Sequence, residues 1–286
     1  MIAHLPRIDA HVHFWEYDAV EYAWIDGSMA SLRRDFGPAE ALAAMHAAGF
    51  DRCVAVQARQ TLHETRWLLT LADEHPCIAA VVGWVDLQAP DITRQLESVA
   101  GSPKLVGVRH IVQSEPDDFL ARPAFRRGIG AVERSGLAYD ILVYARQLPA
   151  VLDFVRAFPS QRFVLDHLGK PGIREGAYDA WRRDVDRLAA RPNVFAKLSG
   201  LVTEADWGSW RPGDLHRYIN AALDSFGAER LMIGSDWPVC TLAGAYSVVM
   251  DVVMTALAER TAAERDAVLG DTARRFWNLS PMESNR

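Results

Sequence analysis

The sequence predicts a single-domain (β/α)8 TIM barrel over residues 1–286, and three observations support this. Short apolar runs alternate with amphipathic segments along the whole chain, as expected for strands buried on both faces of a parallel sheet. The length suits a barrel, which typically needs about 250 residues as one domain. An open, doubly wound sheet is the alternative, but its glycine-rich turn after the first strand is replaced here by His13-Phe14-Trp15.

Eight apolar runs are the candidate strands. In chain order they are Ile8–His13, Arg52–Gln57, Ile78–Val85, Leu105–Ile111, Ala138–Tyr144, Phe163–Leu168, Val194–Leu198 and Leu231–Gly234. The segments between them have helical spacing of apolar residues, and several end at Gly or just before Pro, which are signals of a helix C-terminus. These segments are Ala39–Ala48, Glu64–Glu74, Phe125–Arg134, Leu148–Phe158, Tyr178–Ala190, Leu215–Phe226, Tyr246–Ala258 and Ala262–Trp277. Repeated strand–helix units favour the closed barrel.

Composition excludes several classes of partner. The net charge is −6 and the basic residues are scattered, so no nucleic-acid-binding surface is expected. Cys53, Cys77 and Cys240 lie far apart without metal or redox spacing, which favours a reducing cytoplasm. The N-terminal sequence lacks a signal-peptide or lipidation pattern, and no membrane partner is expected. The chain is therefore expected to be a cytoplasmic monomer or homodimer.

Polar residues gather at the carboxyl ends of the candidate strands. In a (β/α)8 barrel this end carries the active site. In chain order the residues are Asp9, His11, His13, Arg109, His110, Asp140, Tyr144, Asp166, His167, Lys197, Ser199, Ser235 and Asp236.

His11 and His13 are two residues apart, so on a strand they point to the same face. Facing the barrel interior, they are either half of a metal site or two hydrogen-bond donors around a substrate oxygen. The alternative is a pair of surface histidines in a loop. The preceding Ile8–Ala10 resembles a buried strand and favours the interior.

Asp236 is the candidate general base, because it ends an apolar strand and is followed by Trp237-Pro238. An aspartate in this context is also a common helix cap or turn residue. Histidines on other strands favour the catalytic role. Activity is then expected to fall at acid pH as this base becomes protonated.

Five sequence blocks together resemble the amidohydrolase superfamily. They are Asp9–Trp15, Gly107–His110, Leu165–Pro171, Lys197–Gly200 and Gly234–Pro238. Taken in order they cover almost the whole chain, and they are most similar to the branch of sugar-lactone hydrolases and dicarboxylate-pyrone lactonases.

The resemblance implies hydrolysis of a sugar lactone, such as L-fuconolactone, to the free acid. Asp236 would activate water, and His11, His13 and His167 would stabilise the developing oxyanion. Arg109 would hold a lactone or carboxylate oxygen, with His110 also at the substrate. Tyr144 is either a ligand of a substrate hydroxyl or a packed barrel residue.

The same resemblance bears on metals, since many superfamily members bind one or two ions. Tyr144 stands where a second-metal ligand would be expected, so a binuclear site is unsupported. His11, His13, His167 and Asp236 could assemble a mononuclear zinc site. The expectation is that no metal is required, with adventitious or mononuclear zinc compatible with the residues.

The chain has nine tryptophans, several in predicted loops at strand ends. Indole faces suit the C–H face of a sugar ring, although most are expected to be ordinary packing. Trp15 and Trp24 are the expected substrate contacts. Two alternative functions remain open: a metal-dependent decarboxylase of the same superfamily, and a barrel that binds a small ligand without turnover.

Overall fold

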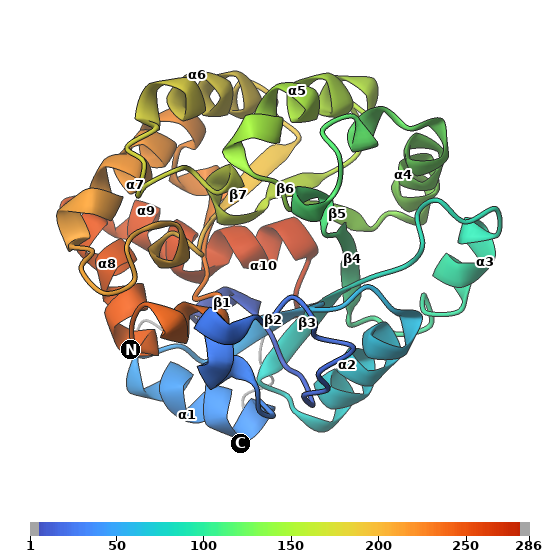
Figure 1. Ribbon diagram of the computed structural model, residues 1–286, viewed down its shortest axis with the longest axis horizontal. Coiled ribbons are helices and arrows are strands. Elements are labelled where there is room, and N and C mark those ends of the chain that lie inside the picture. Colours follow the sequence, from blue (N-terminus) through green and yellow to red (C-terminus); the bar gives the residue numbers. More distant parts are fainter. Residues whose placement is uncertain (1–5, 281–286) are drawn as a thin grey trace.

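The computed structural model describes residues 6–280, and these form a (β/α)8 barrel, as predicted (Figure 1). Eight parallel strands pair in chain order. They are β1 (Ile8–Val12), β2 (Arg52–Val56), β3 (Ile78–Gly83), β4 (Leu105–His110), β5 (Ala138–Ile141), β6 (Phe163–Leu165), β7 (Val194–Leu198) and β8 (Leu231–Ile233). The first and last residues of the predicted domain, 1–5 and 281–286, lie outside the described part.

Hydrogen bonds just beyond the strand ends join β8 to β1. The amide of Asp236 donates to the carbonyl of His11 at 2.9 Å, and the amide of His13 donates to the carbonyl of Trp237 at 2.7 Å. Asp236 is therefore fixed beside the two histidines by the closure of the barrel itself.

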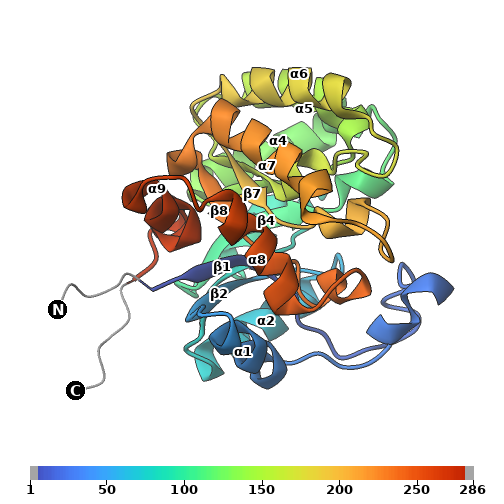
Figure 2. The same ribbon diagram turned by 90° about the vertical axis from the view of Figure 1, so that its left-hand side faces the viewer.

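Helices surround the strands in a ring (Figures 1 and 2). The helices before the last are α1 (Pro38–Ala47), α2 (Leu62–Glu74), α3 (Ile92–Glu97), α4 (Pro123–Ser135), α5 (Leu148–Ala157), α6 (Tyr178–Ala189), α7 (Pro212–Phe226), α8 (Tyr246–Ala256) and α9 (Ala262–Asp266). The last helix, α10 (Thr272–Trp277), lies across one end of the barrel. The sequence did not predict α3, because six residues are too short for a helical pattern to stand out.

The predicted last helix, Ala262–Trp277, is wrong as one continuous element. A π-helical segment, Ala267–Asp271, separates α9 from α10. Gly270 lies so close to the first described residues that an added Cβ would be 2.6 Å from the carbonyl oxygen of Pro6. The chain bends here because it packs against its own N-terminal segment, a long-range contact that local periodicity does not encode.

An apolar cluster fills the barrel interior and is closed by α10. Ile8, Ala10, Val56 and other inward residues share this cluster with Phe276 and Trp277 of α10. Figure 1 shows α10 lying across the ring of strands. The interior is thus packed at one end, and the polar residues occupy the other. Within residues 6–280, no helix has the length and apolar character needed to span a bilayer.

The regular alternation of β1 breaks after Ala10, because the next residue, His11, also faces the barrel interior. The pairing of β1 with β2 shifts register between Asp9 and Val12. Asp9 turns toward the outer ring, where the Tyr246 hydroxyl donates to its Oδ2 at 3.0 Å, and its Oδ1 accepts from the amides of His11 and Ser235. Burial raises the pKa of Asp9 to about 6. Asp9 thus links β1 to β8, while the His11 side chain turns toward Lys197 and Asp166.

The predicted sixth strand, Phe163–Leu168, is too long, because β6 ends at Leu165. His167, Leu168 and Lys170 have φ of 54°, 52° and 48°, so the chain makes a left-handed turn. Each such residue other than glycine costs roughly 1–2 kcal/mol. The indole N–H of Trp181 donates to the carbonyl of Leu168 at 2.7 Å and helps to hold the turn. The predicted fifth strand likewise ends early, at Ile141 rather than Tyr144.

Candidate active site

A cavity of about 220 Å³ opens at the carboxyl ends of the strands. It is lined by His13, Trp24, Ala58, Gln60, Arg109, Ile111, Gln113, Ser114, Glu115, Leu142, His167, Lys170, Asp236 and Val239. A larger groove of about 490 Å³ lies between the N-terminal part of α7 and α8, around Trp207 and Trp210. The smaller cavity is the candidate site, because the polar residues of several strand ends converge there.

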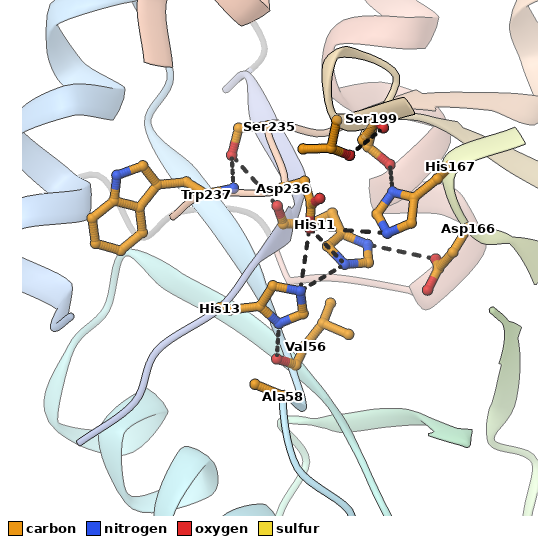
Figure 3. Close-up of polar contacts among 12 residues, drawn as sticks. His11, His13, Val56, Ala58, Asp166, His167, Ser199, Ser235, Asp236 and Trp237 are labelled. Carbon is orange, nitrogen blue, oxygen red and sulfur yellow. Dashed lines mark hydrogen bonds and ion pairs between the residues drawn. The ribbon is translucent and has the colours of Figure 1, made fainter. Parts of the chain in front are cut away.

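The imidazoles of His13 and His167 and the carboxylate of Asp236 line the floor of this cavity, and the fully buried His11 lies beside them (Figure 3). The Nε2 atoms of His11 and His13 are 3.1 Å apart. Oδ1 of Asp236 lies 3.3 Å from Nε2 of His13, 3.7 Å from Nε2 of His11 and 3.9 Å from Nε2 of His167. The expectation that His11 and His13 meet at the barrel mouth is confirmed, and the structure brings all four residues together.

The rings of His13 and His167 are each held by a contact at Nδ1, the nitrogen that faces away from Asp236. Nδ1 of His13 donates to the carbonyl of Val56 at 2.7 Å, since a carbonyl oxygen only accepts. Nδ1 of His167 lies 2.9 Å from the hydroxyl of Ser199. Asp236 itself has φ of 60°, a strained conformation of the kind that gathers at functional sites. The Nε2 atoms are therefore directed at the cavity floor.

Burial and the neighbouring imidazoles set the charges at neutral pH. Burial opposes ionisation of Asp236, but His167, His13 and His11 outweigh it and hold the pKa of this carboxyl well below its usual value. Burial lowers the pKa of His167 to about 4. At neutral pH the site therefore contains an ionised Asp236 beside a neutral His167.

A network of buried charges supports the cluster from below. The guanidinium of Arg109 pairs with Asp166 at 3.0 Å, and Nζ of Lys197 pairs with Asp140 at 2.6 Å and with Asp166 at 2.9 Å. The sequence placed these residues at or near strand ends but gave Asp140, Asp166 and Lys197 no role. Removing one member of such a network leaves a buried charge unpaired and typically costs about 3–5 kcal/mol.

Three of the four converging residues also fit a zinc ion by composition and spacing. Imidazole nitrogens and a carboxylate are common zinc ligands, and in tetrahedral geometry ligand atoms lie roughly 3.3 Å apart. Ligand atoms of His11, His167 and Asp236 lie within 4.8 Å of one another. Nε2 of His11, however, lies 3.2 Å from Nη1 of Arg109, and its Nδ1 lies 3.2 Å from Nζ of Lys197. These two cations oppose the binding of a third cation at His11.

The two predicted substrate contacts, Trp24 and Trp15, lie in different environments. Trp24 lines the cavity and is 39% exposed. Trp15 is only 1% exposed, and its indole N–H donates to the carbonyl of Arg34. The expectation that Trp15 contacts substrate is therefore corrected: its ring packs against Tyr22, Phe36 and Trp24 and supports the wall behind the cavity.

His110 and Tyr144 also lie behind or beside the cavity wall. Nδ1 of His110 accepts from the indole N–H of Trp84 at 3.3 Å, so its Nε2 donates to Glu115 at 3.0 Å. His110 thus positions Glu115, which lines the cavity. Tyr144 is 38% exposed, and its ring lies 5.5 Å from Nζ of Lys170. Its place is the rim of the site.

The sequence did not point to five polar residues of the cavity: Gln60, Gln113, Ser114, Glu115 and Lys170. They lie in the loops after β2, β4 and β6, so their position after strands was the available signal. Among residues 6–280, the buried Oε1 of Gln113 finds no hydrogen-bond partner. A buried acceptor of this kind favours a ligand hydroxyl as its partner.

Comparison with known proteins adds four observations. The sequence profile of the Amidohydrolase family matches residues 8–279. A curated relative from Burkholderia multivorans, named L-fucono-1,5-lactonase, is 45% identical over 285 residues, covering 96% of each chain. A relative of the same name from Burkholderia ambifaria is 43% identical over 83% of this chain and 82% of its own. A crystal structure of a Burkholderia multivorans amidohydrolase with bound zinc has a TM-score of 0.93 at 44% identity, covering 96% of this chain and 100% of that one.

Proposed function

The chain belongs to the amidohydrolase family, and from this premise we propose that it is a lactonase that hydrolyses a sugar lactone of the L-fucono-1,5-lactone class. One observation carries the proposal: an ionised, buried Asp236 lies beside three imidazoles at the floor of a cavity. This arrangement offers a base for water next to N–H donors for an oxyanion.

Asp236 would begin the reaction by taking a proton from water as the water oxygen attacks the lactone carbonyl carbon. The imidazoles that lower its pKa in the free protein also limit its basicity. When substrate draws the N–H groups of His11 and His167 toward its own carbonyl oxygen, these groups stabilise the Asp236 carboxylate less, and Asp236 becomes a stronger base. Substrate binding would thus activate the base.

The negative charge that develops on the carbonyl oxygen would be stabilised by N–H groups of His11, His167 and Arg109. Nδ1 of His13 donates to the carbonyl of Val56, and its Nε2 lies 3.1 Å from His11 and 3.3 Å from Asp236, so His13 would orient these two residues rather than donate to substrate. This assignment refines the expectation that all three histidines are donors.

Collapse of the tetrahedral intermediate breaks the bond between the carbonyl carbon and the ring oxygen. The leaving ring oxygen takes the proton held by Asp236 and becomes a hydroxyl group. The product is an open-chain hydroxy acid, which ionises and releases one proton per turnover. Asp236 returns to its carboxylate form.

The cavity wall combines hydroxyl-binding groups with an apolar side. Gln60, Gln113 and Glu115 offer hydrogen bonds to the ring hydroxyls of a sugar lactone. Ile111 and Leu142 offer apolar contact, and the exposed indole of Trp24 suits a C–H face of the ring. A small polyhydroxylated lactone matches this mixture.

We further propose that the reaction needs no metal, although the site fits zinc. A bound zinc ion would polarise a carbonyl and acidify water. A lactone is an activated substrate compared with an amide, and Arg109 and Lys197 already place positive charge around His11. These groups supply electrostatic stabilisation from the chain's own residues.

A pH-indicator assay with a panel of aldonolactones tests the proposed function. Acid release from L-fucono-1,5-lactone, well above the spontaneous rate, is expected. The same protein should release no carbon dioxide from aromatic carboxylic acids. Zinc-dependent release of carbon dioxide would show instead that the protein is a decarboxylase. Lactone binding without acid release would show that it is a binding protein.

Gly200→Ala is expected to lower kcat/KM by up to about 100-fold, because an added Cβ would lie 2.6 Å from Cγ of His167 and displace the ring. Gly200 also has φ of 61°, which disfavours alanine. Gly136→Ala is the matched control, since Gly136 has φ of 75° with open space at its Cβ. Equal kcat/KM losses in both variants would show that backbone strain, not His167, limits the rate.

The pH profile of kcat/KM is expected to be flat between about pH 5 and pH 8. It should fall with a midpoint near pH 4, the pKa of His167, because a cationic His167 would pair with Asp236 and weaken the base. Asp236 has a pKa well below its usual value, so its own protonation comes later. The loss of activity at acid pH is therefore expected to follow protonation of His167, and not of Asp236 as the sequence suggested. Initial rates at low lactone concentration measure the profile, and a midpoint near pH 6 would contradict it.

A further inference from the structure

Lys197 is fully buried beneath the cavity, and its ammonium group has three close acceptors. Nζ lies 2.6 Å from Oδ2 of Asp140, 2.9 Å from Oδ1 of Asp166 and 3.2 Å from Nδ1 of His11. An ammonium group has three protons and no acceptor. These contacts allow each proton of Lys197 one partner, provided that Nδ1 of His11 carries a lone pair.

His11 lies between two cationic donors, because Nη1 of Arg109 is 3.2 Å from its other nitrogen, Nε2. A neutral imidazole has one N–H and one lone pair, so only one of these two contacts can be a hydrogen bond. The position of the single ring proton decides which one.

The burial of the two donors decides between them. Lys197 is fully buried, and its three close acceptors are Asp140, Asp166 and Nδ1 of His11, so losing His11 would leave a buried N–H unpaired at a cost in free energy. Arg109 lines the cavity, where water or a ligand can accept in place of His11. The single proton of a neutral His11 therefore belongs on Nε2, which faces Nε2 of His13 at 3.1 Å.

We propose that Lys197 is a positioning residue that holds His11 in the tautomer with its proton on Nε2. Lys197 then donates to Nδ1 of His11, and the proton on Nε2 of His11 faces Nε2 of His13 at 3.1 Å and Oδ1 of Asp236 at 3.7 Å. Asp140 and Asp166 hold Lys197 in place.

Two consequences follow from this tautomer. The N–H of His11 faces the His13 and Asp236 side chains that line the cavity, and Nη1 of Arg109 no longer donates to His11. The use of these donors for an oxyanion rests on the proposed function. Zinc, by contrast, needs a lone pair on Nε2 of His11, so Lys197 acts against metal binding by the four converging residues.

Nitrogen-15 NMR of the histidine rings in the wild-type protein at neutral pH tests the tautomer directly. The His11 signals, assigned by their loss in His11→Asn, should show a protonated Nε2 and an unprotonated Nδ1. The opposite pattern, with the proton on Nδ1, would overturn the proposal. This measurement needs no variant of Lys197 and no lactone.

Zinc affinity provides the second test, using the double variant Lys197→Met with Asp140→Asn, which removes a cation and an anion together. Competition with a chromogenic chelator should show zinc bound about 10–100-fold more tightly than by the wild type. Lys104→Met is the control, because Nζ of Lys104 donates to the carbonyl of Ile78, away from the cavity, and its affinity should be unchanged.

An unchanged or weaker zinc affinity in a folded double variant would contradict the proposal. If the double variant does not fold, the NMR result alone decides. Neither readout depends on lactone hydrolysis, so failure of the proposed function and failure of this proposal are separate outcomes.

Discussion

Asp236→Asn is expected to lower kcat on the best lactone by about 10²–10⁴-fold, the usual contribution of a general base. The asparagine keeps the size of the side chain but removes the basic oxygen that faces the three imidazoles. The main-chain bond from residue 236 to the carbonyl of His11 is retained, so the fold should be preserved. Steady-state kinetics and thermal unfolding, measured together, check both statements.

Asp251→Asn is the matched control, because it makes the same chemical change on the exposed side of α8. Its kcat should equal that of the wild type. Near-normal turnover by Asp236→Asn would show that another group activates water. Failure of Asp236→Asn to fold would make Asp236 a structural residue and leave the base unidentified.

Arg109→Met is expected to have two effects. Loss of a buried cation paired with a substrate oxygen should raise the transition-state free energy by roughly 2–5 kcal/mol, seen as a lower kcat/KM. Loss of the 3.0 Å pair with Asp166 should also lower the free energy of unfolding by about 3–5 kcal/mol. The sequence analysis anticipated only the first effect, since it assigned no partner to Arg109.

Arg109→Lys separates the two effects. A lysine keeps the positive charge beside Asp166 but lacks the second guanidinium nitrogen, which donates to the main-chain carbonyl of Gln57. The free energy of unfolding should therefore recover more fully than kcat/KM. Arg94→Met serves as the control, since that side chain is 83% exposed. Unchanged kcat/KM in a folded Arg109→Met would leave Arg109 with a structural role alone.

The barrel and its central residues were predictable because they follow strict local rules. Apolar strands and two-residue spacing placed His11 and His13 on the interior face, and strand-end position selected Asp236 and His167. The structure adds that the β1–β2 register shifts beside them, between Asp9 and Val12. Such an irregularity depends on contacts with Tyr246, far away in sequence, which no local pattern reveals.

The cavity wall was harder to predict. Trp15 and Trp24 look equivalent in sequence, yet tertiary packing buries one and exposes the other. Lys170 enters the cavity because a left-handed turn follows β6, whereas the apolar pattern suggested a longer strand. Residues other than glycine rarely adopt a positive φ, so local propensity predicts no such turn here. Surrounding contacts hold these residues in that conformation.

In the proposed mechanism the chain's own residues, without a metal, hydrolyse the lactone. The decisive measurement is acid release from L-fucono-1,5-lactone by protein stripped with chelator, with zinc content measured in the same sample. We expect the metal-free protein to keep most of its rate. Loss of the rate on stripping, with recovery on addition of zinc alone, would contradict it.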